Sequence, residues 1–259
     1  MNILALKGGV IIQSYLSYPE ILKKCELLNE QYEINQHYFD HIVEDLLSSD
    51  RPTNEVIMAG FHRLLEQVNE EMANMEDFMD VKASCFMGCA FCCYFPIIIT
   101  QAESSMMKRA IDQWPKERKE KLMKHLEQYY ATYGEEVERI TALDQEDPAF
   151  KKKYIASQVP CPMLDPETNL CMAYEIRPIP CRTYVNYSDP KVCANNHMPK
   201  ETLSFEFLYE FYMGGLNEIM QELYENGEDM LVDYPSDMWQ YDFLANWAKD
   251  WLREEESSV

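Results

Sequence analysis

Glycine is scarce in this sequence, with only 8 glycines among 259 residues. Phosphate-binding loops of the GxGxxG and GxxxxGK[ST] kinds need closely spaced glycines, because their backbone must approach the phosphates directly. Neither motif occurs. The sequence therefore excludes nucleotide-binding proteins that rely on a glycine-rich loop.

Basic residues and long apolar runs are also lacking. Lys and Arg number 23 against 45 Asp and Glu, which gives a formal net charge of −22. Sequence-independent binding to nucleic acids needs clustered basic side chains that neutralise phosphates. No stretch reaches the ~18 apolar residues that a membrane-spanning helix requires. We therefore expect no nucleic-acid partner and no membrane span.

The first twenty residues lack the features of a secretory signal peptide. They have neither a basic start nor a small-residue cleavage site, and no long apolar core lies between. We therefore predict a cytoplasmic protein. In that compartment cysteines persist as thiols or metal ligands rather than as disulfides.

Apolar residues recur at spacings of three and four over the first half of the chain, which predicts amphipathic helices. We expect one helix from Pro19 to about Leu47 and a second, long helix after Thr53, ending near Met79. Thr100 followed by Glu103 is a capping box, which predicts the start of another helix. A charged helix is expected at 116–143.

Two further apolar stripes predict helices near the C-terminus. The first runs from Phe205 to Leu223 and contains Gly214–Gly215, where we expect a kink. The second stripe places an aromatic residue at every fourth position, at Trp239, Phe243, Trp247 and Trp251.

Strand patterns are weak and are confined to 94–99 and 183–187.

These patterns predict a mainly α fold in which helical N- and C-terminal flanks surround an irregular, cysteine-rich metal-binding core. We divide the chain into a helical region at 1–82, a cysteine-cluster domain at 83–198 and a helical region at 199–259 that packs on the rest. Six of the 13 prolines lie at 160–190. We therefore expect loops and short turns there rather than a long helix.

Cysteine is the residue that stands out, because eight of the nine cysteines fall into two groups. Several thiolates around one point select zinc, iron–sulfur clusters or cuprous copper rather than magnesium or calcium. Ligands two to four residues apart reach a common metal with little loss of loop-closure entropy. Cys25 lies apart in an apolar-periodic stretch and is expected to be a small buried core residue. The predicted metal ligands are Cys85, Cys89, Cys92 and Cys93 in the first group and Cys161, Cys171, Cys181 and Cys193 in the second.

The residues around both groups resemble the YkgJ-type cysteine-cluster family, known as a zinc- or iron-chelating domain. Three motifs occur in the family's order: a cysteine cluster at 85–93, C-P-x-L at 161–164, and C-x-x-Y-E-x-R-P-x-P-C-R-x-Y at 171–184. The sequence departs from the family pattern at Cys85, because three residues rather than two lie between it and Cys89. Cys193 lies outside the core pattern. The resemblance implies a zinc or iron cofactor but no assigned biochemical role.

Two alternative functions follow from the first group and from the family. The first group also resembles the CxxxCxxC motif of radical S-adenosylmethionine enzymes, although no βα alternation surrounds it. Because the cysteine-cluster family includes flagellin lysine methylases, one alternative is an iron–sulfur-dependent protein-lysine methyl transferase. The other is a metallo-scaffold or metal chaperone that binds a protein partner through its helical flanks. The spacing of the cysteines does not decide between zinc and an iron–sulfur cluster, and it assigns no catalytic residue.

Arg177 and Arg182 are the predicted cofactor-binding residues outside the cysteines. Four thiolates around a divalent metal leave a net negative charge, which a nearby guanidinium offsets while its hydrogen bonds tune the centre. The alternative for Arg177 is a surface ion pair with Glu175. Histidine adds weaker candidates: His37 and His41 share a predicted helix face on which packing is the favoured role, and His197 follows the last cysteine of the second group.

Overall fold

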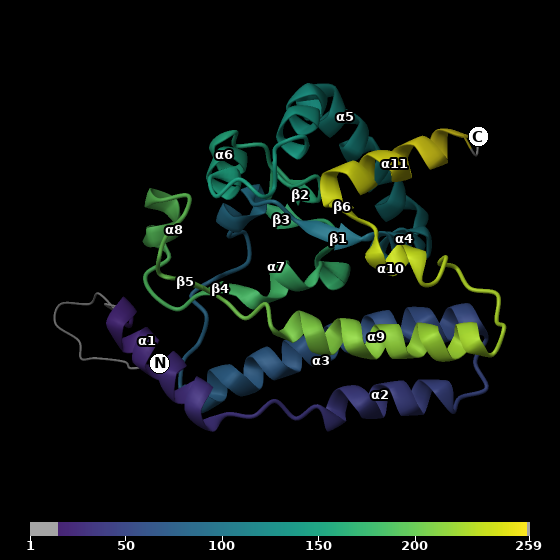
Figure 1. Cartoon of the computed structure of the whole chain (residues 1–259). Coiled ribbons are helices and arrows are strands. Elements are labelled where there is room, and N and C mark those ends of the chain that lie inside the picture. Colours follow the sequence, from purple (N-terminus) through teal and green to yellow (C-terminus); the bar gives the residue numbers. More distant parts are fainter. Residues whose placement is uncertain (1–14, 258–259) are drawn as a thin grey trace.

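The computed structural model describes residues 15–257, and 1–14 and 258–259 lie outside the described residues, as does most of the stretch considered above for a signal peptide. Helices dominate the described part, which confirms the mainly α expectation. Two groups of helices lie on either side of short strands and turns (Figure 1). Among the described residues, no helix combines the length and the apolar composition needed to cross a bilayer.

The chain begins with two helices where the sequence predicted one from 19 to 47. Helix α1 spans Tyr18–Gln31 and α2 spans His37–Leu47. The chain leaves the helical conformation at Tyr32, whose ψ is 128°. The side chain of Asn35 then accepts a hydrogen bond from the backbone N–H of His37 at 3.2 Å. This cap satisfies one of the free amides at the start of α2, and the expectation of a continuous helix was therefore wrong.

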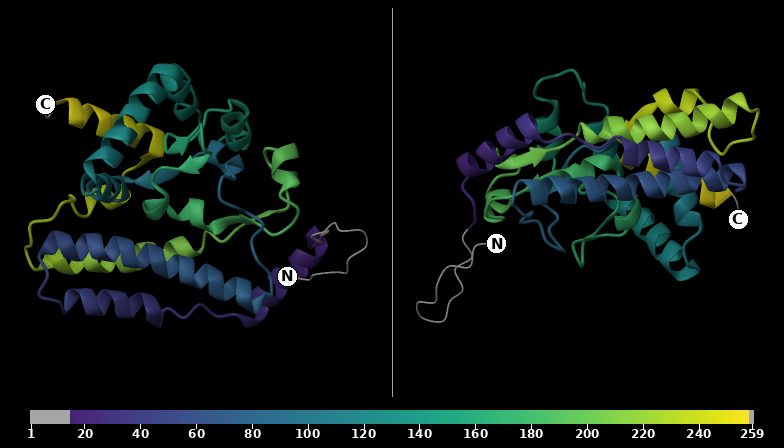
Figure 2. Two further views of the ribbon diagram at one scale, coloured as in Figure 1. Left: turned by 180° about the vertical axis from the view of Figure 1, so that it is seen from behind. Right: turned by 90° about the horizontal axis from the view of Figure 1, so that it is seen from below.

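Helices α2 and α3 (Thr53–Phe78) follow one another in the chain and form a bundle with α9 (Leu208–Glu225), which comes from a distant part of the sequence. Helices α3 and α9 lie side by side, as Figure 1 and the left view of Figure 2 show. Two glycines allow this approach: a Cβ at Gly60 would lie 2.7 Å from Ile219 Cδ1, and one at Gly215 would lie 3.0 Å from Leu64 Cδ2. Helix α9 runs unbroken through Gly214–Gly215, and within this pair Gly215 serves packing, whereas a Cβ at Gly214 would meet nothing within 4 Å.

The second group of helices contains α4 (Gln101–Asp112), α5 (Lys116–Thr141) and α11 (Leu244–Ser257). The predicted capping box is present at the start of α4. Thr100 Oγ1 accepts the backbone N–H of Glu103 at 3.0 Å, and the Glu103 carboxylate accepts the backbone N–H of Thr100 at 3.0 Å. Helix α5 confirms the charged helix predicted at 116–143 to within two residues.

The aromatic stripe at four-residue spacing does not form one helix. Helix α10 (Ser236–Trp239) ends at once, strand β6 (Tyr241–Phe243) follows, and α11 begins only afterwards. Strand β6 pairs antiparallel with β1 (Ile98–Thr100). Hydrogen bonding to β1 therefore outweighs the helical periodicity at Trp239, which is 73 % exposed.

Within the described part of the chain, three two-stranded antiparallel sheets join the irregular segments to one another. Besides β1–β6, they are β2 (Leu164–Asp165) with β3 (Leu170–Cys171) and β4 (Tyr184–Asn186) with β5 (Thr202–Ser204). Strands β1 and β4 overlap the two predicted strand segments. The remaining elements are short: the 3₁₀ helices η1 (Phe91–Tyr94) and η2 (Tyr174–Ile176), and helices α6 (Phe150–Ala156), α7 (Ile179–Thr183) and α8 (Lys191–Asn195).

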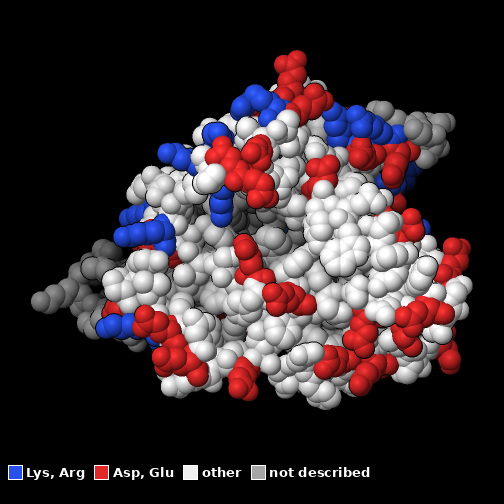
Figure 3. All heavy atoms as spheres, viewed as in Figure 1, with Lys and Arg blue, Asp and Glu red and all other residues white. Residues whose placement is uncertain are grey.

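The bundle carries much of the negative charge. Helices α2 and α9 contain seven Asp and Glu residues and no Lys or Arg. Figure 3 shows acidic side chains over the lower part of the molecule, where these two helices lie, and most of the basic side chains above them. A surface of this kind repels phosphate backbones and other anions.

Candidate metal centre

A tight turn holds the first two cysteines of the first group. The backbone N–H of Cys89 donates to the carbonyl oxygen of Phe86 at 2.9 Å, and Gly88 between them has a φ of +88°. Glycine adopts this left-handed conformation without steric cost. Both the N–H and the hydroxyl of Ser84 donate to the carbonyl oxygen of Asn186, at 2.7 and 2.9 Å. The turn is therefore anchored on β4, which belongs to the second cysteine segment.

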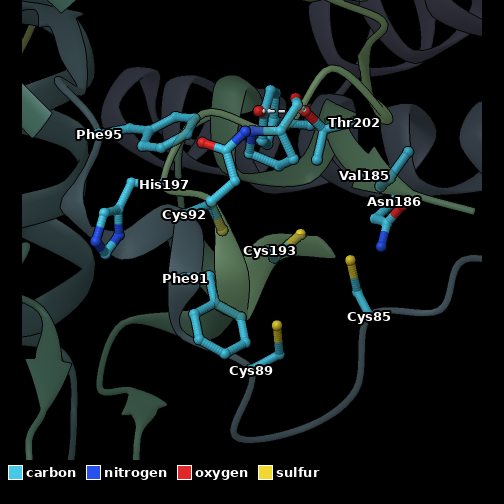
Figure 4. A pocket seen from close by; sticks show the side chains of 13 residues that line it. Cys85, Cys89, Phe91, Cys92, Phe95, Val185, Asn186, Cys193, His197 and Thr202 are labelled. Atoms are coloured by element: carbon cyan, nitrogen blue, oxygen red, sulfur yellow. Dashed lines mark hydrogen bonds between the residues drawn. The ribbon is translucent and has the colours of Figure 1, made fainter. Parts of the chain in front are cut away.

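The 3₁₀ helix η1 carries the next two cysteines. Neighbouring residues of such a helix leave its axis about 120° apart, and the thiols of Cys92 and Cys93 are hydrogen-bonded to each other. Cys92 lines a cavity of about 30 Å³, whereas Cys93 is not part of its lining. The lining also includes Cys85, Cys89 and Cys193, and Figure 4 shows the four sulfur atoms directed toward a common space. We call Cys85, Cys89, Cys92 and Cys193 the outer cysteines.

The other four ligand candidates, Cys93, Cys161, Cys171 and Cys181, are here called the inner cysteines. The backbone N–H of Cys161 donates to the carbonyl oxygen of Cys93 at 2.6 Å, which joins the two sequence groups. Cys161 in turn accepts the N–H of Leu164, and Leu164 pairs with Cys171 across the β2–β3 ladder. Cys181 lies in α7, whose start is fixed by Pro178 and Pro180.

Electrostatic interactions confirm that the inner cysteines are neighbours. Burial raises the pKa of Cys181 to about 12, and it also raises the pKa of Cys161 and Cys171. Repulsion from Cys171 and Cys181 adds to the effect of burial on the pKa of Cys161. A hydrogen bond with Cys92 is the largest cause of the raised pKa of Cys93, and burial and repulsion from Cys161 and Cys181 add to it. The inner thiols therefore lie within electrostatic range of their neighbours, and Cys92 acts on Cys161 and Cys181 as well.

The outer cysteines are tuned mainly by hydrogen bonds between thiols. A hydrogen bond between Cys85 and Cys89 raises the pKa of Cys85 and lowers that of Cys89 to about 6. A hydrogen bond from Cys93 similarly lowers the pKa of Cys92. Burial raises the pKa of Cys193 to about 11, with smaller contributions from Cys89 and Cys92. Thiolates next to thiols are the starting point for metal binding, because the thiolate is the ligand.

Arg182 is buried beside the inner cysteines. Its guanidinium donates to the carbonyl oxygens of Arg177 and Glu175 and to the side-chain oxygen of Asn69, at 2.8, 2.6 and 3.0 Å. Burial lowers its pKa to about 10, and its positive charge lowers the pKa of Cys181 against the effect of burial. Arg182 therefore lies close to the thiols, and charge compensation of a metal centre by this residue stays a prediction.

Arg177 does not form the alternative surface pair with Glu175. That carboxylate accepts a hydrogen bond from Arg118 at 2.7 Å, and Arg177 lies over the ring of Tyr174, 4.2 Å from its centroid. The Nε atom of Arg177 is buried without a hydrogen-bond partner among the described residues. A buried, unpaired guanidinium N–H beside Cys171 and its neighbours fits an anionic thiolate centre, which would accept this hydrogen bond.

Among residues 15–257, no three Cys, His, Asp or Glu side chains already surround one point closely enough to hold a metal ion. The cysteines are gathered as thiols and are all free of disulfides. Metal binding would require them to lose protons and to turn toward a common point. The donor set consists of sulfur, which fits zinc and iron and disfavours magnesium and calcium.

The remaining sequence candidates lie in different surroundings. Cys25 is half-buried and packs against the main apolar core. His37 and His41 are exposed on α2, with ring centroids 6.2 Å apart. His197 lies in the wall of the cavity formed by the outer cysteines (Figure 4).

Several residues around the cysteines were not anticipated from the sequence. Asn69 reaches Arg182 from α3, and Lys151 lies 5.1 Å from the ring centroid of Phe95 in the cavity wall. The wall also contains Phe91 and Tyr184. Asn69 and Lys151 come from helices outside the cysteine motifs, so their sequence positions carry no signal of this role.

Comparison with known proteins identifies one family. Residues 84–201 match the family model CxxCxxCC, described as "Putative zinc- or iron-chelating domain". The match contains all eight ligand candidates and none of the bundle helices α2, α3 and α9. It confirms the resemblance to a cysteine-cluster family. No curated protein and no solved structure matches the chain.

Proposed function

We propose that this chain binds zinc or iron through its clustered thiolates, because residues 84–201 match a family model described as a zinc- or iron-chelating domain. The observation that carries the proposal is the convergence of two sequence segments about 70 residues apart. Cys161 is hydrogen-bonded to Cys93 through the backbone, and Cys193 shares a cavity with Cys85 and Cys89.

The surroundings of the thiols support the proposal. Arg182 is buried and held by three hydrogen bonds, and Arg177 has a buried N–H without a partner. A buried cation without a carboxylate partner is costly unless another anion lies nearby. Thiolates bound to a metal would supply that negative charge.

The proposal also includes a cellular setting. Nine cysteines without a disulfide suit a reducing compartment, so we place the protein in the cytoplasm. Helices α2 and α9, which carry only acidic charges, argue against a nucleic-acid partner and leave a protein partner as the alternative.

Anaerobic purification followed by elemental analysis and visible spectroscopy tests this function. Stoichiometric zinc in a colourless protein would identify a zinc site, whereas iron, sulfide and broad absorption near ~400 nm would identify an iron–sulfur cluster. The matched control is Cys25→Ser, which removes a thiol outside both groups and should leave the metal content unchanged. A protein that retains neither metal, as purified or after anaerobic reconstitution, would contradict the proposal.

The same measurements separate the alternative functions. A methyl transferase that depends on an iron–sulfur cluster requires iron and sulfide, so zinc alone would exclude it. A metal chaperone should release its metal to an acceptor protein, whereas a scaffold should keep it. Transfer of zinc to a metal-free acceptor, followed by native mass spectrometry, distinguishes these two cases.

A further inference from the structure

We propose that the chain holds two metal centres of different character rather than one. The inner cysteines (Cys93, Cys161, Cys171 and Cys181) would form a closed centre, and the outer cysteines (Cys85, Cys89, Cys92 and Cys193) an open centre that exchanges its metal with solvent. This inference rests on the proposed function. It adds the number of sites, their ligands and their accessibility.

The first argument is the division of the thiols into two sets of four. All four outer cysteines line the same cavity, and no inner cysteine contributes to its wall. The division passes between Cys92 and Cys93, which are adjacent in η1 and whose thiols are hydrogen-bonded to each other, so the two centres would lie side by side. Four sulfur ligands are the number that a tetrahedral zinc site requires, so each set is sufficient alone.

The second argument is exposure of the flanking residues. Next to the outer cysteines, Phe86 and Met87 are 59 % and 88 % exposed, and Cys85 itself is exposed. Next to the inner cysteines, Ala173 and Ile179 are fully buried. Solvent and competing ligands therefore reach the outer set more easily than the inner set.

The third argument is the position of the arginines. Arg182 follows Cys181 in α7, and its guanidinium donates to the carbonyl oxygens of Glu175 and Arg177, which lie in the chain between Cys171 and Cys181 of the inner set. Guanidinium charges and hydrogen bonds near thiolates strengthen metal retention, so the inner centre should hold its metal more firmly.

The fourth argument is the cavity itself. Its volume of about 30 Å³ equals roughly that of one water molecule in the liquid. A metal held at its edge would thus lie beside space for one small additional ligand. The aromatic rings of Phe91, Phe95 and Tyr184 cover other parts of the wall, and His197 lies at its edge with the ring turned away from the four sulfur atoms.

The test uses the full chain, freed of metal under reducing conditions and reloaded with Zn²⁺. Bound zinc is counted by native mass spectrometry, and its release to the chromophoric chelator 4-(2-pyridylazo)resorcinol is followed over time. We expect two zinc ions per chain, one released roughly 10–100-fold faster than the other. Cys193→Ser and Cys85→Ser should each abolish the fast phase and leave one slowly released zinc.

Cys171→Ser provides the reciprocal variant, and Cys25→Ser is the matched control that should retain both phases. If Cys171→Ser does not fold, the two outer variants still decide the question, because their effect is confined to the exposed set. One zinc per chain in the unaltered protein, or loss of both zinc ions in Cys193→Ser, would overturn the two-centre inference and leave the proposed function intact. Retention of neither zinc nor iron by the unaltered protein would overturn both.

Discussion

The bundle and the cysteine region of this protein are built by different means. In the bundle of α2, α3 and α9, the helices are 11 to 26 residues long and residues such as Leu64 and Ile219 are completely buried. In the cysteine region, defined as 84–96 and 161–195, no described element exceeds five residues. Burial of apolar area can stabilise the first, whereas the second needs cross-links between short segments. We therefore expect metal binding and folding to be coupled in the cysteine region only.

Removal of metal should produce the largest difference in stability between the bundle and the cysteine region. A structural four-thiolate zinc site contributes roughly 10–16 kcal/mol of apparent binding free energy. We therefore expect a chelator under reducing conditions to unfold the cysteine region locally while the bundle stays folded. Hydrogen exchange with mass spectrometry should show lost protection at 161–195 and retained protection in α3 and α9.

The control for this experiment is addition of Zn²⁺ after the chelator, which should restore protection. Equal protection of both regions with and without metal would show that the cysteine region is stable by its own packing.

Leu64→Ala should affect the bundle instead. Leu64 is fully buried and lies against Gly215 of α9. Truncation of a buried leucine lowers the free energy of unfolding by about 2–5 kcal/mol. Urea denaturation should record this loss, while metal content per folded chain stays constant. Leu27→Ala, at a position 41 % exposed on α1, is the control and should change stability by no more than about 0.5 kcal/mol. A drop in metal content together with stability would contradict the independence of the two regions.

Gly60→Ala tests the close approach of α3 and α9. The added Cβ would lie 2.7 Å from Ile219 Cδ1, so we expect overpacking that costs about 1–3 kcal/mol of unfolding free energy. Combination with Ile219→Val removes that Cδ1 atom and should recover part of the loss. Gly134→Ala in α5, where nothing lies within 4 Å, should instead stabilise the protein by about 0.5–1 kcal/mol. Thermal denaturation measures all three variants, and a neutral Gly60→Ala would show that the contact is not restrictive.

Glu103→Gln should have the smallest effect on the free energy of unfolding, and this effect should depend on pH. Glu103 is 2 % exposed, and Tyr209 of α9 donates a hydrogen bond to it at 3.2 Å. Burial raises its pKa above the ordinary value of 4.5, so unfolding above pH 4.5 releases a proton. The contribution of Glu103 to stability is therefore largest below pH 4.5 and falls as pH rises through the raised folded pKa.

The glutamine variant lacks this titration, so its stability relative to the unaltered protein should increase as the pH rises from 4.5 to 7.5. Urea denaturation at several pH values provides the measurement. A stability difference that is constant with pH would show that Glu103 does not titrate differently in the folded and unfolded states.

The sequence predicts the long helices well because local signals determine them. The capping box at Thr100 and the apolar periodicity of 53–79 need no distant partner. Failures occurred where a distant or competing interaction decides the structure. Pairing of β6 with β1 ends the aromatic stripe at Trp239, and the Asn35 cap divides the first predicted helix.

The candidate site shows the same division. Spacing and motif identify the cysteines as ligand candidates, and they also draw attention to Arg182. They cannot show that Cys193 joins Cys85 across the cavity or that Asn69 holds Arg182, because both contacts depend on how separate segments pack. The sorting of eight thiols into two sets is a property of the tertiary structure alone.

The adjacent cysteines of η1 limit where insertions and deletions can be accepted in this sequence during evolution. A single peptide bond joins Cys92, in the wall of the cavity, to Cys93, next to Cys161. A length change in the turn at 86–88 lies outside η1 and keeps the two thiols in the same orientation to each other, whereas a residue inserted between them would separate the two sets. Length variation is therefore tolerable in the turn at 86–88 but not within this doublet, which fixes the register of the whole cysteine region.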